Sequence, residues 1–149
     1  MQGIVFIGMQ GSGKSSFFKE RFFSTHVHIS LDVLKTRHRE QRILEVCLDT
    51  NQRFVIDNTN PTRAERIRYL NPAKAARFKM VGYYFQSNVE DCLRRNSERS
   101  DDSRVPNVAI LSTVKKLELP SLDEGFDQLF SVRLDDGRFF VEEFKDEVR

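Results

Sequence analysis

The chain has 149 residues, of which 39% are hydrophobic and 31% are charged, and 24 lysines and arginines against 22 acidic residues leave a net charge of +2. This length and balance predict one soluble globular domain over residues 1–149 and argue against long disorder or two full domains. Because no apolar run approaches the roughly 20 residues of a membrane helix, a membrane protein is not expected.

The predicted elements begin as an alternation of strands and helices. Residues 4–7 form a short apolar run before a glycine, which is typical of a buried parallel strand rather than of a signal peptide. A helix is expected over residues 13–23, a second strand over 27–29 and a helix with an apolar side over 37–49. Residues 53–57 then form a third strand that ends in an acid.

Proline and glycine mark the element boundaries in the second half. Pro61 suits the first turn of a helix that is expected to run to about Leu70, where Asn71 and Pro72 break it before a second short helix over residues 73–77. The remaining predicted elements are a strand over 79–85, a helix over 88–99, a charged loop over 100–104, a helix over 106–116 and two strands, 128–134 and 138–144, around an Asp-Asp-Gly turn. This order predicts an α/β fold with a mainly parallel sheet, right-handed crossovers and a C-terminal antiparallel hairpin.

Charge is distributed unevenly along the chain. Residues 118–149 carry 10 acidic and 4 basic side chains, whereas residues 1–117 carry 20 basic and 12 acidic ones. The basic part could attract a polyanion such as a nucleic acid or could be a solvated surface, and the acidic hairpin could be a partner surface or only a sheet edge. Cys47 and Cys92 lack metal-ligand spacing, which favours reduced thiols in a cytoplasmic protein.

The segment Gly8-Met9-Gln10-Gly11-Ser12-Gly13-Lys14-Ser15 matches the pattern G-x-x-x-x-G-K-[ST] in full, between a predicted strand and a predicted helix. Glycines let backbone N–H groups surround phosphate oxygens, and the helix N-terminus adds positive charge. Lys14 is expected to reach the β- and γ-phosphates of ATP and Ser15 to bind Mg²⁺, with Ser16 beside them. A chance match occurs in roughly one chain in a hundred or fewer, so the motif predicts nucleotide binding but leaves kinase, GTPase and ATPase open.

A small kinase suits this chain better than a motor ATPase, and the Asn-Lys-x-Asp motif of small GTPases does not occur in the sequence. A kinase needs a proton acceptor for the attacking hydroxyl and cations over the transferred phosphoryl group. Asp32 follows the second predicted strand, at the sheet edge where ligands bind, and is the candidate base; a helix cap explains it equally well. Asp57 ends the third strand and is the candidate Mg²⁺ ligand, in addition to Ser15.

Two further groups are candidates for contacts with the substrates. Arg95 and Arg99 share one helix face at i, i+4 spacing, and the polar loop after them could close as a lid over ATP; a solvated helix face is the simpler alternative. The candidate acceptor-binding residues are Lys35, Arg37, Arg39, Thr59 and Asn60. A second basic stretch over residues 63–79 could also contact acceptor phosphates, and either stretch could equally be plain surface.

These segments together resemble the 5′-hydroxyl polynucleotide kinase family of small P-loop kinases. The resemblance rests on residues 8–15, 27–32, 55–61, 92–99 with 105–106, and 115–126, in the family's order. The blocks Asp-Asn-Thr-Asn-Pro and Pro-Ser-Leu-x-Glu-Gly-Phe are more specific than the phosphate loop. The resemblance implies a three-layer P-loop kinase fold with a helical lid, ATP and Mg²⁺ as cofactors, and a nucleic acid 5′-OH end, of DNA or RNA, as acceptor.

Site roles implied by the resemblance transfer position by position. Lys14 and Ser15 match the phosphate and Mg²⁺ residues, Asp32 matches the acid that accepts the 5′-hydroxyl proton, and Arg95 and Arg99 match the lid arginines that hold ATP phosphates. These roles are what the family implies. Known relatives often carry a phosphatase or repair module as well, and none is expected within these 149 residues.

The surroundings of Asp32 depart from the family pattern. Ser30 and Leu31 stand where the family usually has Asn-Arg, and Lys35 stands where an arginine is common. Lysine offers a point charge in place of a forked contact, so the change affects acceptor recognition. The alternatives are therefore a kinase for a small hydroxyl compound, such as a nucleoside, sugar or antibiotic, and a non-catalytic ATP-gated binding module. The sequence makes no prediction of the oligomeric state.

Overall fold

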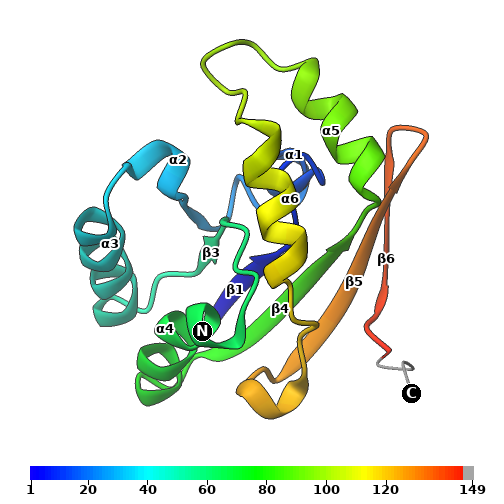
Figure 1. Cartoon of the computed structure of the whole chain (residues 1–149). Coiled ribbons are helices and arrows are strands. Elements are labelled where there is room, and N and C mark those ends of the chain that lie inside the picture. Colours follow the sequence, from blue (N-terminus) through cyan, green and yellow to red (C-terminus); the bar gives the residue numbers. More distant parts are fainter. Residues whose placement is uncertain (146–149) are drawn as a thin grey trace.

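The computed structural model describes residues 1–145, which form a six-stranded sheet in the order β2-β3-β1-β4-β5-β6. The strands are β1 (Gln2–Ile7), β2 (Val27–Ile29), β3 (Phe54–Ile56), β4 (Lys79–Gln86), β5 (Gln128–Asp135) and β6 (Arg138–Glu143). Strands β1 to β5 run parallel, and β6 pairs antiparallel with β5 at the edge (Figure 1). The predicted mainly parallel sheet with a C-terminal hairpin is confirmed.

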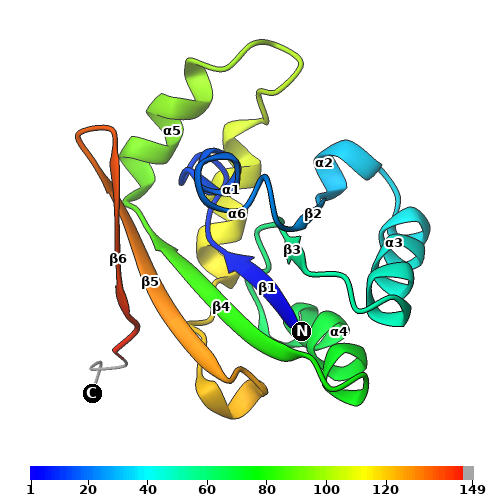
Figure 2. The same ribbon diagram turned by 180° about the vertical axis from the view of Figure 1, so that it is seen from behind.

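Helices cover both faces of this sheet. They are α1 (Lys14–Arg21), α2 (Leu31–Leu34), α3 (Arg37–Asp49), α4 (Arg63–Ala75), α5 (Val89–Ser97), α6 (Asn107–Lys116) and the short 3₁₀ helix η1 (Leu122–Glu124). Side chains alternate along β1, so Val5 and Ile7 pack against α3 and α4 while Ile4 and Phe6 pack against α1. Figure 1 looks onto the face that carries α4 and α6, and Figure 2 shows α1 on the opposite face. The predicted three-layer architecture is therefore confirmed.

Helix α4 differs from its prediction. The expected break at Asn71 and Pro72 and the second short helix over residues 73–77 are wrong, because α4 continues through Pro72 to Ala75. Its buried residues are Arg66, Tyr69, Leu70 and Ala73, which share one helix face, whereas Pro72 is exposed. Burial of that face outweighs the hydrogen bond that the exposed proline cannot donate.

The start of α4 is also later than expected. Thr62 is the N-cap residue, and its hydroxyl accepts a hydrogen bond from the backbone N–H of Glu65 at 3.2 Å. Pro61 therefore precedes the cap instead of lying in the first turn, which begins at Arg63. A threonine oxygen satisfies a free N–H of the first turn, which proline could not do.

Loops that follow the parallel strands meet at one edge of the sheet. The N–H of Gly8, after β1, donates to the carbonyl of Thr59 at 3.0 Å, and the N–H of Asp57, after β3, donates to the carbonyl of Ile29 in β2 at 2.8 Å. Parallel strands present their carboxyl ends together, which is where open α/β sheets bind ligands. Helices α5 and α6 rise beside this edge (Figure 1).

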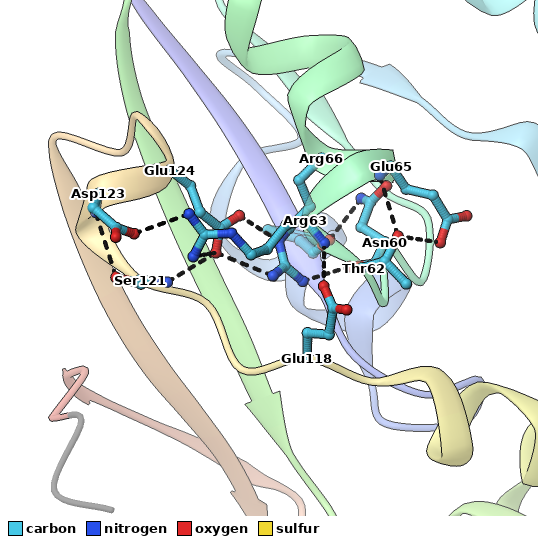
Figure 3. A network of polar contacts seen from close by, with 10 residues as sticks. Asn60, Thr62, Arg63, Glu65, Arg66, Glu118, Ser121, Asp123 and Glu124 are labelled. Carbon is cyan, nitrogen blue, oxygen red and sulfur yellow. Dashed lines mark hydrogen bonds and ion pairs between the residues drawn. The ribbon is translucent and has the colours of Figure 1, made fainter.

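A buried ion pair fastens the segment after α6 to α4 (Figure 3). The Arg66 side chain is fully buried, and its Nε and Nη2 atoms donate to the two carboxylate oxygens of Glu124 at 2.7 and 3.0 Å. Its Nη1 atom donates to the carbonyl of Asn60 at 3.0 Å, and the N–H of Ser121 donates to Glu124 Oε2 at 2.9 Å. Part of the predicted second basic stretch is thus structural.

Within residues 1–145, the helices are all too short or too polar to cross a lipid bilayer.

Candidate active site

The glycine-rich loop between β1 and α1 has the backbone shape that its glycines predict. Gly11 and Gly13 have φ angles of 83° and 100°, in the left-handed region that favours glycine. A Cβ atom at Gly11 would lie 2.8 Å from the carbonyl oxygen of Cys92, because the loop runs against α5. The backbone of α5 therefore leaves no room for a side chain at Gly11. Helix α1 begins directly after the loop, at Lys14.

Lys14 places its charge inside this loop. Its side-chain nitrogen donates to the carbonyls of Gly8 at 3.1 Å and Met9 at 2.8 Å, and the residue is only 9% exposed. Burial lowers the pKa of the Lys14 ammonium, and the nearby Asp57 carboxylate acts in the opposite direction. An ammonium that has lost most of its water is a strong attractor for a polyanion such as a triphosphate.

Ser15 and Asp57 form a pair beside the loop. The Ser15 hydroxyl donates to Asp57 Oδ2 at 2.9 Å, and Nε2 of His28 lies 2.7 Å from the same oxygen. A hydroxyl and a carboxylate side by side suit Mg²⁺, which takes oxygen ligands and usually shares its shell with phosphates and water. Over the described residues 1–145, no cluster of three or more His, Cys, Asp or Glu side chains could hold a metal by itself. The pair fits an ion that a bound nucleotide would also coordinate.

His28 was not expected as part of this site. Its ring stacks on Phe18 at a centroid distance of 4.1 Å, which directs Nε2 toward Asp57. His28 and Asp57 are 29 residues apart in the chain, and the pairing of β2 with β3 brings them together. A local sequence pattern carries no signal for such a contact.

A cleft of about 260 Å³ opens at the carboxyl edge of the sheet. Ten of the predicted site residues line it: Gln10, Gly11, Gly13, Lys14, Ser15, Ser16, Asp32, Asp57, Thr59 and Arg99. The other lining residues are Leu31, Asn58 and Val105. The cleft thus joins a phosphate-binding loop, a hydroxyl–carboxylate pair, a second carboxylate and an arginine.

Asp32 lies in the first turn of α2, with an exposed side chain on the wall of the cleft. The alternative of a capping aspartate is wrong, because Ser30 occupies the N-cap position. An exposed carboxylate that faces a phosphate loop can accept a proton from a hydroxyl bound between them.

Arg95 and Asn60 lie outside the cleft lining, as drawn from residues 1–145. Nη1 of Arg95 donates to the carbonyl of Gly11 at 2.9 Å and contacts the Ser87 hydroxyl at 3.3 Å, so Arg95 holds the back of the phosphate loop. Asn60 is buried and donates its amide to the carbonyl of Phe6 at 2.8 Å. Both residues support the site through the backbone.

Lys35, Arg37 and Arg39 also lie beyond the lining residues of the described chain. All three are exposed, but Arg37 bonds to Glu40 at 3.0 Å and Tyr69 at 2.8 Å, and Arg39 donates to the carbonyl of Leu34 at 3.1 Å. The Arg37 contacts are structural, whereas Lys35 and Arg39 stay on the surface next to α2.

The predicted lid, which is the arginine-bearing helix with the polar loop after it, corresponds to α5 and the loop that leads to α6. Helix α5 ends at Ser97, so Arg99 lies in the loop, where its Nη1 atom is 3.4 Å from the carbonyl of Ser103. Asn96 closes the base of this loop, since its amide donates to the carbonyl of Val105 at 2.6 Å and accepts from the Val105 N–H at 3.0 Å. The sequence assigns no site role to Asn96, which only falls within the helix expected over residues 88–99.

Comparison with known proteins places this geometry in a family. A family model described as an AAA domain matches residues 4–120. The chain is 32% identical over 136 residues to a protein of Acanthamoeba polyphaga mimivirus and 26% identical over 133 residues to one of Schizosaccharomyces pombe, both described as bifunctional polynucleotide phosphatase/kinases. Each match covers 87% of this chain but only about a third of the relative, 32% and 33%. The resemblance to the polynucleotide kinase family is confirmed over the matched residues, which make up about a third of each relative.

A solved structure supports the fold. Kti12 of Chaetomium thermophilum, in complex with ADP-AlF3, superposes with a TM-score of 0.67 at 20% identity and covers 90% of each chain. This likeness agrees with the P-loop architecture derived above.

Proposed function

Since the chain belongs to the AAA domain family, whose model spans both the phosphate loop and the lid, we propose that it is an ATP-dependent kinase that transfers the γ-phosphate to the 5′-OH of a polynucleotide. The observation that carries this proposal is that Asp32, Lys14 and the Ser15–Asp57 pair face the same cleft. The similarity to two polynucleotide phosphatase/kinases supports the choice of acceptor.

Each group has a role in this reaction. The N–H groups of the phosphate loop and the Lys14 ammonium bind the triphosphate, and Ser15 and Asp57 hold Mg²⁺, which supplies charge neutralisation at the phosphates when bound. The Asp32 carboxylate orients the acceptor hydroxyl and takes its proton. The hydroxyl oxygen forms a bond to the γ-phosphorus, the bond to the β–γ bridging oxygen breaks, and ADP leaves.

The acceptor is best identified by a transfer screen. γ-Labelled ATP is offered with 5′-OH oligonucleotides of DNA and RNA, with 5′-phosphorylated controls, and with nucleosides and sugars. Label is expected on the 5′-OH oligonucleotides alone. If the protein contacts two acceptor phosphates, a fourfold rise in salt weakens binding of single strands about sevenfold. Labelling of small alcohols with none of the oligonucleotides would overturn the acceptor, and no transfer to any acceptor would favour an ATP-gated binding module.

Arg99→Ala is expected to lower the transfer rate by at least about tenfold, because the guanidinium is the lid cation that faces the cleft. Single-turnover kinetics with saturating ATP measures this loss. Arg94→Ala is the matched control, since Arg94 is an exposed arginine of α5 that pairs with Asp91 at 3.0 Å. Equal losses in the two variants would remove Arg99 from the reaction.

A further inference from the structure

A hydrogen-bond chain behind the cleft ties α2 to α3 and α4. We call it the α2 strut; it consists of the Leu31 N–H and the side chains of Asn58, Glu40, Tyr69 and Arg37. Only Leu31 and Asn58 reach the cleft, and the other three lie between α3 and α4. The strut therefore connects the cleft to side chains of α3 and α4 that lie outside its lining.

The first link holds the beginning of α2. The N–H of Leu31, the first residue of the helix, donates to Asn58 Oδ1 at 2.9 Å. The first N–H groups of a helix lack partners within the helix, and over the described chain the Ser30 side chain makes no capping hydrogen bond. Asn58 thus supplies the cap that Ser30 does not, from a different strand end.

The second link orients the Asn58 amide. Its Nδ2 atom donates to Glu40 Oε2 at 2.7 Å and to the Tyr69 hydroxyl at 3.2 Å. With both ends of the amide in use, the side chain has one favourable orientation, in which its oxygen faces Leu31.

The third link fixes the partner groups themselves. Glu40 is 2% exposed and accepts from Arg37 at 3.0 Å and from the Tyr69 hydroxyl at 3.0 Å. Burial, and after it the negative charge of the Glu40 carboxylate, raises the pKa of Tyr69 to about 12. The phenol therefore keeps its proton and donates a hydrogen bond. Because the buried polar groups of Glu40 and Tyr69 all have hydrogen-bond partners, this part of the strut is rigid.

Helix α2 needs such a support. It has only four residues, each at least partly exposed, and it ends at Leu34, before the C-cap residue Lys35, whose φ is 73°. Core packing alone holds it weakly, and Asp32 directly follows the residue that Asn58 binds.

We infer that Asn58, held by Glu40 and Tyr69, is a positioning residue that sets the location of the Asp32 carboxylate in the cleft. This inference rests on the proposed role of Asp32 as proton acceptor. Asn58 acts on the reaction through the backbone of α2, and a displacement of a reacting group by even 1 Å can cost two orders of magnitude in rate.

The decisive test compares Asn58→Ala in two backgrounds. In the otherwise unchanged protein, the substitution is expected to lower transfer to the acceptor about tenfold or more, with ATP affinity unchanged. In an Asp32→Asn background, where there is no proton acceptor left to position, the same substitution should change the residual rate less than about twofold. A loss of the same size in both backgrounds would overturn the inference, because Asn58 would then act independently of Asp32.

Further variants separate positioning from stability. Tyr69→Phe removes only the hydroxyl that binds Asn58 and Glu40. It should lower the transfer rate less than Asn58→Ala does, and it should have almost no effect in the Asp32→Asn background. Val81→Ala, at a buried residue of the separate core cluster under α1, perturbs packing away from the strut and should leave transfer within about twofold. If Val81→Ala with a matched drop in unfolding temperature lowered transfer as much as Asn58→Ala, the strut would be structural only.

A readout that needs no activity distinguishes this inference from the proposed function. Hydrogen exchange at the Leu31 and Leu34 amides, which donate to Asn58 Oδ1 and to the Ser30 carbonyl, should quicken about tenfold in Asn58→Ala, while the β1 and β3 amides stay unchanged. If the unaltered protein transfers no phosphate to any acceptor, the proposed function fails, and this exchange result alone decides whether Asn58 anchors α2. Unchanged exchange at Leu31 would contradict the anchoring.

Discussion

Replacing Asp32 with asparagine is expected to reduce phosphoryl transfer to the acceptor at least about 100-fold, the usual scale for loss of a general base, while ATP affinity stays close to that of the unaltered protein. Asparagine keeps the size of the side chain but cannot take a proton from the attacking hydroxyl. The nucleotide is expected to bind at the phosphate loop, through Lys14 and Ser15, and not through the Asp32 side chain on another wall of the same cleft. Single-turnover transfer and a nucleotide-binding titration on the same preparation measure the two quantities separately.

Asp49→Asn is the matched control, because Asp49 is an exposed aspartate at the end of α3. Near-normal transfer by Asp32→Asn would remove Asp32 from the mechanism. A parallel loss of ATP affinity would instead assign Asp32 to the nucleotide.

The second large effect concerns stability. Arg66→Met is expected to lower the free energy of unfolding by about 3–5 kcal/mol, because it leaves the Glu124 carboxylate buried without its partner. Urea unfolding followed by circular dichroism gives this value. Because both charges are removed together, the double variant Arg66→Met with Glu124→Leu should recover much of the loss.

Arg42→Met is the control for this ion pair. Arg42 pairs with Glu45 at 3.3 Å on the surface of α3, away from Glu124, and such a pair contributes about 1 kcal/mol or less. If the Arg42 and Arg66 variants unfolded at the same urea concentration, the buried pair would not be what fastens the segment after α6.

The sequence predicts the sheet well because its signals are local. The apolar strand before Gly8 and the glycine-rich turn fix β1, the loop and α1 in order, and the carboxyl ends of parallel strands then bring Asp32 and Asp57 to the same edge. Proline at position 72 misleads for a physical reason: its effect depends on which face of the helix is buried, and that is set by tertiary packing.

The parts that the sequence does not predict depend on distant partners. Arg66 lies in a basic stretch that the sequence assigns to acceptor contacts or to surface. Its burial depends on the carboxylate of Glu124, 58 residues away, and on the carbonyl of Asn60. The amide of Asn60 and the guanidinium of Arg95 turn toward backbone carbonyls, and spacing alone does not give that direction. Asn58 belongs to the Asp-Asn-Thr-Asn-Pro block, but the sequence does not show that it binds Leu31 of α2 and Glu40 of α3.

The measurement that tests the proposed function most directly is a crystal structure of the protein with Mg²⁺, a non-hydrolysable ATP analogue and a 5′-OH oligonucleotide. We predict that the γ-phosphate lies at Lys14 and that the 5′ oxygen lies within about 2.6–3.2 Å of the Asp32 carboxylate, in line with the phosphorus. A 5′ end bound away from α2, with the Asp32 carboxylate turned to solvent, would contradict the proposed mechanism.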